Sequence, residues 1–135
     1  MNFRSLVAAM FALSGAGHAV AQDLSAQTAH RYSVPGKVLM VDVRRPEEWA
    51  ETGVAPGAAL ITLQDTDFLD RLAAAAGGNK EAAIAFICRS GVRSAVATGK
   101  ARAAGYTNVY NITGGMSMAG GWIDAGLPLV AAGSK

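Results

Sequence analysis

Residues 82–94, Ala-Ala-Ile-Ala-Phe-Ile-Cys-Arg-Ser-Gly-Val-Arg-Ser, carry the strongest indication of the fold. The run from Ala82 to Ile87 is almost continuously apolar, which is typical of a strand buried on both faces of a sheet. Residues 93–104 have the composition of a helix that stops at Gly105. A buried strand, a tight loop and a helix in this order predict an α/β fold with mainly parallel strands.

The same alternation continues on both sides of this stretch. Further strands are expected at residues 37–43, 59–63 and 109–112. Further helices are expected from Pro46 onward, from a cap at Asp65 to Ala76, and over residues 116–125. Residues 37–130 thus predict a single α/β domain, a mainly parallel central sheet with helices on both faces. Residues 22–36 carry little pattern and are treated as an N-terminal segment.

Composition excludes several classes of protein. Of 135 residues, 51% are hydrophobic and 16% charged, which excludes a disordered chain. A net charge of +2 is too small to indicate a nucleic-acid partner or an anionic membrane surface. The single cysteine, Cys88, excludes a disulfide framework and paired-cysteine zinc sites. No metal is predicted, and a monomer is the default expectation.

The first 21 residues resemble an export signal in their charge and apolar pattern. Arg4 is followed by an apolar run from Leu6 to Leu13 and by Ala19-Val20-Ala21, which has the small-residue cleavage pattern. The run is shorter than the roughly 20 residues that span a bilayer. We therefore expect cleavage after Ala21, no stable membrane anchor, and a periplasmic location.

The loop after the buried strand, residues 88–94, is the candidate site. Ligands bind at the carboxyl ends of strands in open α/β sheets, where loop N–H groups and the next helix favour an anion. Gly91 permits backbone angles that a side chain forbids, and Arg89 and Arg93 add positive charge. These surroundings predict a lowered pKa for Cys88 and therefore a nucleophile inside an anion-binding cup. The competing interpretation is a small, buried, inert cysteine.

The loop also resembles the active-site loop of the rhodanese (sulfurtransferase) family. Residues 42–49, Asp-Val-Arg-Arg-Pro-Glu-Glu-Trp, are similar to a second segment of that family. Residues 111–116, Asn-Ile-Thr-Gly-Gly-Met, with Trp122 behind them, are similar to a third, and residues 105–109 fit the segment before it. The resemblance is in chain order and implies a single rhodanese-like domain.

The resemblance implies a thiosulfate sulfurtransferase, an enzyme that moves a sulfane sulfur through a persulfide on the catalytic Cys88. It implies that Arg89 and Arg93 hold a small anionic donor such as thiosulfate, and that cyanide or a thiol accepts the sulfur. It gives the rest of the loop a substrate-binding role: Ser90, Gly91, Val92 and Ser94. Asp42 and Arg44 are expected to support the site structurally, as an ion pair. No cofactor is implied.

Two positions depart from the family pattern. Val54 stands where the family usually has histidine, and Leu60 begins a stretch that replaces its usual Asn-Ile-Pro. Both lie outside the candidate loop, so they bear on local packing and on the rim of the site more than on the reaction.

Two other functions fit parts of this pattern. Phosphatases and arsenate reductases also place cysteine and arginine around an oxyanion, but related phosphatase loops are one residue longer than the one between Cys88 and Arg93. The second is a non-turnover persulfide carrier that passes sulfur to a protein partner. Turnover with a small acceptor, against stoichiometric transfer to one protein, separates the carrier from the enzyme.

Overall fold

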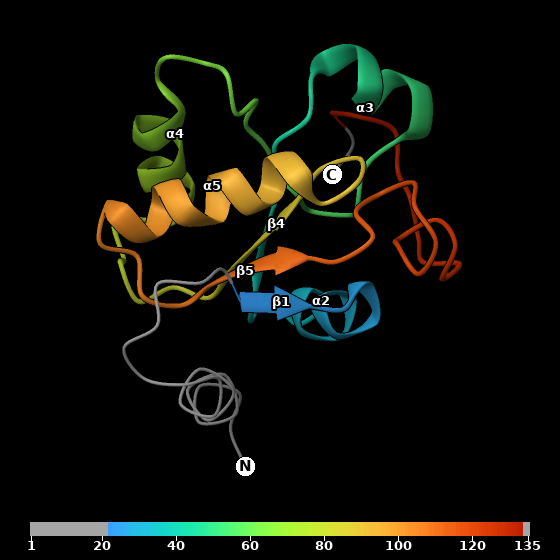
Figure 1. Cartoon of the computed structure of the whole chain (residues 1–135), viewed down its shortest axis with the longest axis horizontal. Helices are drawn as coiled ribbons and strands as arrows, with labels where there is room; N and C mark the ends of the chain where they lie inside the picture. Colours follow the sequence, from blue (N-terminus) through green and yellow to red (C-terminus); the bar gives the residue numbers. More distant parts are fainter. Residues whose placement is uncertain (1–21, 134–135) are drawn as a thin grey trace.

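The computed structural model describes residues 22–133, which fold around one sheet of five parallel strands (Figure 1). The strands are β1 (Gln22–Leu24), β2 (Leu39–Asp42), β3 (Ala59–Leu60), β4 (Ile84–Ile87) and β5 (Val109–Ile112). They lie in the order β1-β5-β4-β2-β3. The helices within this range are α2 (Ala26–Ser33), α3 (Pro46–Thr52), α4 (Phe68–Ala75) and α5 (Val92–Ala103). The predicted α/β class and parallel sheet are confirmed.

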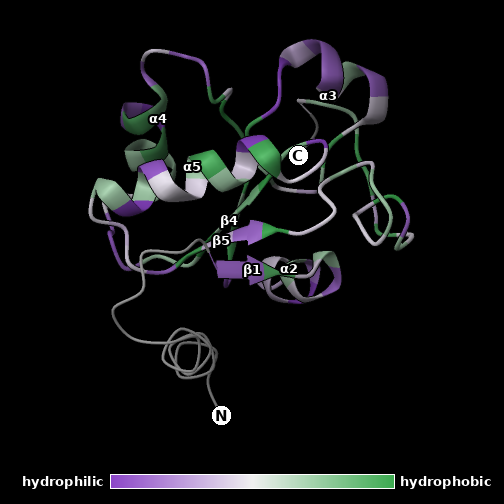
Figure 2. Cartoon of the chain, in the orientation of Figure 1, coloured by the Kyte–Doolittle hydropathy of each residue, from purple (hydrophilic) through white to green (hydrophobic). Residues whose placement is uncertain are grey.

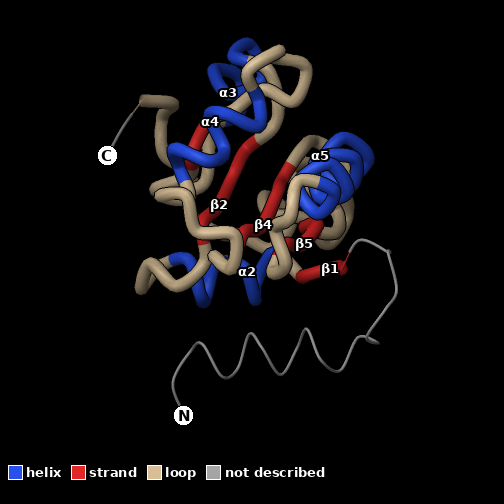
Figure 3. The backbone as a smooth tube through the Cα atoms, turned by 90° about the vertical axis from the view of Figure 1, so that its left-hand side faces the viewer, coloured by secondary structure: helices blue, strands red, loops and turns tan. Residues whose placement is uncertain are grey.

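Helices cover both faces of the sheet, as Figures 1 and 3 show from two directions. Because successive strand residues point to opposite faces, β4 divides its side chains between two cores. Ile84 and Phe86 pack under α4 and α5, whereas Ala85 and Ile87 face α2 and the C-terminal loops. All four residues of β4 are buried, as expected of a central parallel strand.

Helix α3 is different from the others because none of its residues is fully buried. Its residues are mostly hydrophilic (Figure 2), and it follows the carboxyl end of β2. Pro46 occupies its first turn, as predicted, since a missing N–H costs nothing there. The position of α3 brings one of its acidic side chains, Glu48, to Arg93 at the start of α5, which follows β4.

The N-terminal segment, residues 22–36, is part of the domain. β1 pairs with β5 in parallel, with Gln22 opposite Tyr110 and Leu24 opposite Ile112. Ser25 caps α2 by accepting a hydrogen bond from the N–H of Thr28 at 3.1 Å. The sheet therefore begins before residue 37, where the sequence analysis starts the domain. A strand of three residues with a single apolar side chain leaves little pattern to recognise.

The predicted helix over residues 116–125 is wrong, since these residues form a series of tight turns. Gly115 and Gly120 have φ of +51° and +77°, in the left-handed region that interrupts a helix. The cap predicted at Asp65 is also wrong, because α4 starts later, after Asp67. The carboxylate of Asp65 instead accepts a hydrogen bond from the guanidinium of Arg71 at 2.9 Å.

The expected signal peptide, residues 1–21, lies outside the described residues. Within the part of the chain that the structure describes, no helix is long and apolar enough to cross a membrane.

Candidate active site

The candidate site lies where the carboxyl ends of three neighbouring strands meet. β4 pairs with β2 on one side and with β5 on the other. Cys88 follows β4 directly, Asp42 is the last residue of β2, and Asn111 is the next-to-last residue of β5. Parallel pairing thus brings the three motifs together although they are far apart in the sequence.

The loop after β4 closes around the sulfur of Cys88. The N–H of Gly91 donates a hydrogen bond to Cys88 Sγ at 3.0 Å, and the hydroxyl of Ser94 lies 3.3 Å from the same atom. Gly91 has φ of +107° and is the residue before α5, so the chain turns sharply there. The cysteine side chain is fully buried at the base of this turn.

Hydrogen bonds make Cys88 more acidic than an ordinary thiol. Burial by itself would raise the pKa of the Cys88 thiol, because it disfavours the charged form. The Ser94 hydroxyl and the backbone N–H groups of Ser94, Gly91 and Ser90 outweigh burial, and the pKa is lowered overall. The site therefore favours the thiolate, which is the nucleophilic form.

A second loop, after β5, supports the cysteine loop from behind. The N–H of Met116 donates to the carbonyl oxygen of Cys88 at 2.7 Å, and the N–H of Ser117 donates to that of Arg89 at 3.0 Å. A Cβ atom on Gly115 would lie only 2.5 Å from the carbonyl oxygen of Arg89. Glycine is therefore required at position 115 for the two backbones to approach this closely.

The two arginines of the loop have different surroundings. Arg93 forms a two-pronged ion pair with Glu48 of α3, with nitrogen–oxygen distances of 2.6 and 2.8 Å. Hydrogen bonding from Arg93 is the main reason that the pKa of Glu48 falls from 4.5 to about 2, against the opposing effect of burial. The Arg89 side chain is exposed and makes no hydrogen bond or ion pair with any residue in 22–133.

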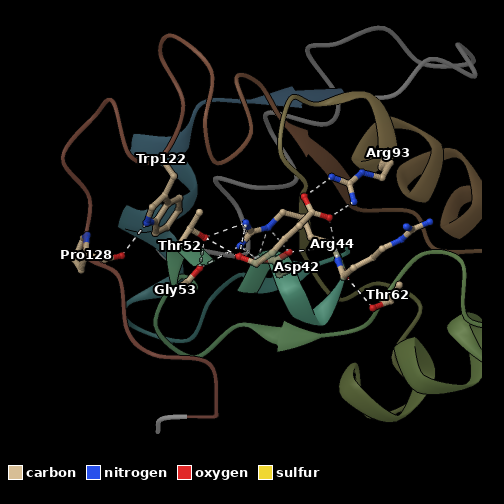
Figure 4. A network of polar contacts seen from close by, with 10 residues as sticks. Asp42, Arg44, Thr52, Gly53, Thr62, Arg93, Trp122 and Pro128 are labelled. Carbon is tan, nitrogen blue, oxygen red and sulfur yellow. Dashed lines mark hydrogen bonds and ion pairs between the residues drawn. The ribbon is translucent and has the colours of Figure 1, made fainter. Parts of the chain in front are cut away.

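Asp42 and Arg44 form a buried ion pair beside the site (Figure 4). Arg44 Nε and Nη2 donate to the carboxylate of Asp42 at 2.9–3.2 Å. The guanidinium also donates to Thr52 Oγ1 at 3.0 Å and to the carbonyl oxygen of Gly53 at 3.1 Å. This network ties the end of β2 to the C-terminal end of α3, the helix that carries Glu48.

The remaining loop residues form the rim. Ser90 is exposed, and its N–H contributes to the lowered pKa of Cys88. Val92, the first residue of α5, is 70% exposed, so its side chain has no role in the core. No group of three potential metal ligands occurs among residues 22–133.

The sequence analysis missed three residues of the site. It gave Glu48 no role in the site, but the Glu48 carboxylate pairs with Arg93, which is 45 positions later in the sequence. It did not single out Asn111, whose side chain contacts Ser94, or Gly115, whose backbone contacts the cysteine loop. All three residues lie inside the motifs quoted above, so the motifs indicated the right segments. The individual contacts could not be predicted, because each joins residues far apart in the sequence.

Comparison with known proteins agrees with this geometry. The family model of the rhodanese-like domain matches residues 25–119. The chain belongs to the rhodanese-like family. A protein of Rickettsia prowazekii named "Uncharacterized protein RP600" is 34% identical over 98 residues, covering 66% of this chain and 80% of that protein.

Several solved structures are also similar to this chain. The crystal structure of Rv0390 from M. tuberculosis superposes with a TM-score of 0.69 at 27% identity, covering 84% of this chain and 99% of that one. The polysulfide-sulfur transferase homodimer from Wolinella succinogenes has a TM-score of 0.66 at 25% identity, covering 95% and 86%. The rhodanese-like chain thus belongs to a sulfur-transfer family, and a cradle with one cysteine is compatible with that chemistry.

Proposed function

We propose that this rhodanese-like protein is a sulfurtransferase that carries a sulfane sulfur as a persulfide on Cys88. The observation that supports this most directly is the environment of Cys88 Sγ. It accepts a hydrogen bond from the N–H of Gly91 at 3.0 Å and has the Ser94 hydroxyl at 3.3 Å. Donors that stabilise a thiolate also suit the terminal sulfur of a persulfide, which is anionic too.

In the first half-reaction the Cys88 thiolate attacks the outer sulfur of thiosulfate or a similar donor. A sulfur–sulfur bond forms to Cys88 Sγ, and the bond between the two donor sulfurs breaks. Sulfite leaves with the electron pair of that bond. In the second half-reaction cyanide or a thiol attacks the terminal sulfur of the persulfide, and the thiolate of Cys88 leaves. This sequence gives ping-pong kinetics.

The charges at the rim favour Arg89 as the group that meets an anionic donor. Its side chain is exposed, whereas the guanidinium of Arg93 is engaged by Glu48 at 2.6 and 2.8 Å. A guanidinium binds oxyanions well because its planar fork donates two parallel hydrogen bonds. Arg93 then contributes mainly by holding α3 against the start of α5.

The test is the intact mass of the mature protein before and after thiosulfate. Wild-type protein gains the mass of one sulfur atom and loses it again when cyanide is added, whereas Cys88→Ser gains nothing. If reduced, folded wild-type protein stays unmodified, thiosulfate is not a donor. Mercaptopyruvate and protein persulfides are then the donors to compare.

One observation favours the second candidate, a persulfide carrier that delivers sulfur to a protein. Val92 and Val96 are 70% and 57% exposed, and they lie one helical turn apart at the start of α5, beside the cysteine loop. Apolar side chains at a reactive rim suit a protein partner better than a small anion. Steady turnover with cyanide supports the enzyme, and a single stoichiometric transfer supports the carrier.

We also propose that the protein works in the periplasm after export. β1 begins at Gln22, the residue after the expected cleavage point, so removal of residues 1–21 leaves the whole sheet in place. The N-terminal mass of protein recovered from the periplasm tests this. A mature chain that begins at Gln22 supports export, and an uncleaved chain in the cytoplasm contradicts it.

A further inference from the structure

The buried hydroxyl of Ser94 lies between Cys88 and Asn111, and Asn111 has no part in the proposed sulfur transfer. Ser94 Oγ is 3.3 Å from Cys88 Sγ and 2.5 Å from Asn111 Oδ1. Cys88 and Ser94 are fully buried and Asn111 is 8% exposed, so water has little access to compete for these groups. The three side chains come from the end of β4, from α5 and from β5.

The Ser94 hydroxyl has one proton and two neighbouring acceptors. A serine hydroxyl donates one hydrogen bond and accepts up to two. When the proton points to Asn111 Oδ1, the sulfur of Cys88 receives no hydrogen from Ser94. When it points to the sulfur, the Oδ1 atom of Asn111 loses its donor. Hydrogen bonds to sulfur are longer than those to oxygen, but the 2.5 Å between the Ser94 and Asn111 oxygens is short even for a hydroxyl donor, so the amide oxygen is a strong competitor.

We propose that Asn111 is a positioning residue that competes with Cys88 for the Ser94 hydroxyl proton and so limits how strongly Ser94 stabilises the sulfur anion. This role deepens the proposed sulfur-transfer function and rests on it, because its consequence is the reactivity of Cys88. The competition shifts the cysteine toward the less reactive thiol form when no donor is bound. A thiol is also less easily oxidised than a thiolate, which suits a free cysteine in an oxidising compartment.

The other charged groups near the site do not change when Asn111 is replaced. Arg93 of α5 faces Cys88 and interacts with it electrostatically. Glu48 of α3 neutralises Arg93, Asp42 at the end of β2 and the nearby Arg44 neutralise each other, and Arg89 is exposed to solvent. None of these groups hydrogen-bonds to Asn111 in the described structure, so replacing the amide changes the proton competition and leaves the ion pairs intact.

The experiment measures the pKa of Cys88 from the pH profile of alkylation by iodoacetamide, using the full mature chain. The main variant is Asn111→Leu, which is similar in size and removes the competing acceptor without adding charge. It frees the Ser94 proton for the sulfur, so we expect the pKa to fall by up to about one pH unit, the value of one hydrogen bond to an ion. Asn111→Asp adds a stronger acceptor and raises the pKa.

The Ser94→Ala background separates this role from a merely structural one. Without the hydroxyl there is no proton to compete for, so adding Asn111→Leu to Ser94→Ala leaves the pKa of Cys88 unchanged. Asn108→Leu is the control, because Asn108 is a half-buried asparagine directly before β5 that contacts Tyr110 instead of the site. We expect it to leave the pKa of Cys88 at the wild-type value.

A rise or no change in Asn111→Leu overturns the proposal, and so does an equal fall in the Ser94→Ala background. If Asn111→Leu does not fold, Asn111→Asp decides the question in both backgrounds. Its charge raises the pKa of Cys88 with or without Ser94, so the rise must be larger when the Ser94 hydroxyl is present. An equal rise in the Ser94→Ala background overturns the proposal. Sulfur loading from thiosulfate is measured separately on wild-type protein. Failure to load contradicts the proposed function, whereas the order of the pKa values tests Asn111 alone.

Discussion

Replacing Glu48 by glutamine tests the ion pair that holds α3 to the cysteine loop. Glu48 Oε1 and Oε2 accept hydrogen bonds from Arg93 at 2.6 and 2.8 Å. Glutamine has nearly the same shape as glutamate but no charge. Its side-chain NH₂ group is a hydrogen-bond donor, so it would face a donor N–H group of Arg93 and form no hydrogen bond with it. The variant therefore loses the charge attraction and one of the two hydrogen bonds.

The pKa of Glu48 sets the size of the effect. A fall from 4.5 to about 2 is equivalent to about 3 kcal/mol of stability at neutral pH. The two side chains are 23% and 26% exposed, so solvent screens part of this interaction. We expect Glu48→Gln to lower the free energy of unfolding by about 1–2 kcal/mol at pH 7.

The loss depends on pH in a defined direction. Because the folded-state pKa of Glu48 is lowered, its stabilisation is complete above the unfolded value of 4.5 and disappears as the pH falls toward 2. Urea unfolding of both proteins between pH 7 and pH 3 measures this. The difference between wild type and Glu48→Gln narrows below the unfolded pKa, since protonation removes the same charge from the wild type.

The control is Glu47→Gln, which removes an exposed carboxylate from the same helical turn. We expect it to change the free energy of unfolding by no more than a few tenths of a kcal/mol. A difference between wild type and Glu48→Gln that stays constant from pH 7 to pH 3 would refute the reasoning, and so would equal losses in the two variants.

Three further predictions follow from the same structure. Asp42→Ala leaves the buried guanidinium of Arg44 without its carboxylate, so we expect urea titrations to show a free energy of unfolding lower by about 3–5 kcal/mol. The control is Asp65→Ala, which breaks an ion pair with Arg71 that is more than 40% exposed and lowers the free energy of unfolding by less than about 1 kcal/mol. The pKa of Cys88 is lowered in the folded protein, so the midpoint of its alkylation rate against pH lies at a lower pH than in the urea-unfolded protein. Equal midpoints for the folded and unfolded protein contradict stabilisation of the thiolate by the loop hydrogen bonds. Gly115→Ala and Gly120→Ala both place alanine at positive φ, at about 1 kcal/mol each, but only the first meets the cysteine loop, so only Gly115→Ala loses sulfur loading.

Local pattern was sufficient to predict the centre of the fold. The strand expected at residues 82–87 is β4 at Ile84–Ile87, and the one expected at 109–112 is β5 with the same bounds. Both strands are buried on two faces, so most of their residues are apolar and the pattern is dense. The helix between them starts at Val92, one residue earlier than expected.

Elements without such a pattern could not be predicted. β1 is an edge strand of three residues, and its place in the sheet depends on β5, almost ninety positions later. The stretch from residue 116 to 125 has apolar residues at helical spacing, but its glycines allow a close contact between backbones instead. Tertiary contacts decide the structure in both cases, and a short stretch of sequence does not show which distant residues it will contact.

The same limit explains why the charges of the site differ from those expected. The loop sequence shows two arginines near a cysteine, which suggests that cations lower its pKa. In the folded protein the larger contributions come from the Ser94 hydroxyl and the N–H groups of the loop, while Arg93 is largely neutralised by Glu48. Fixed dipoles stabilise the sulfur anion in the free protein without binding it as a counter-ion would, and the exposed Arg89 stays available for the donor that we propose. In the proposed mechanism, activation of the nucleophile and attraction of the anionic donor are thus carried out by different groups of the same loop.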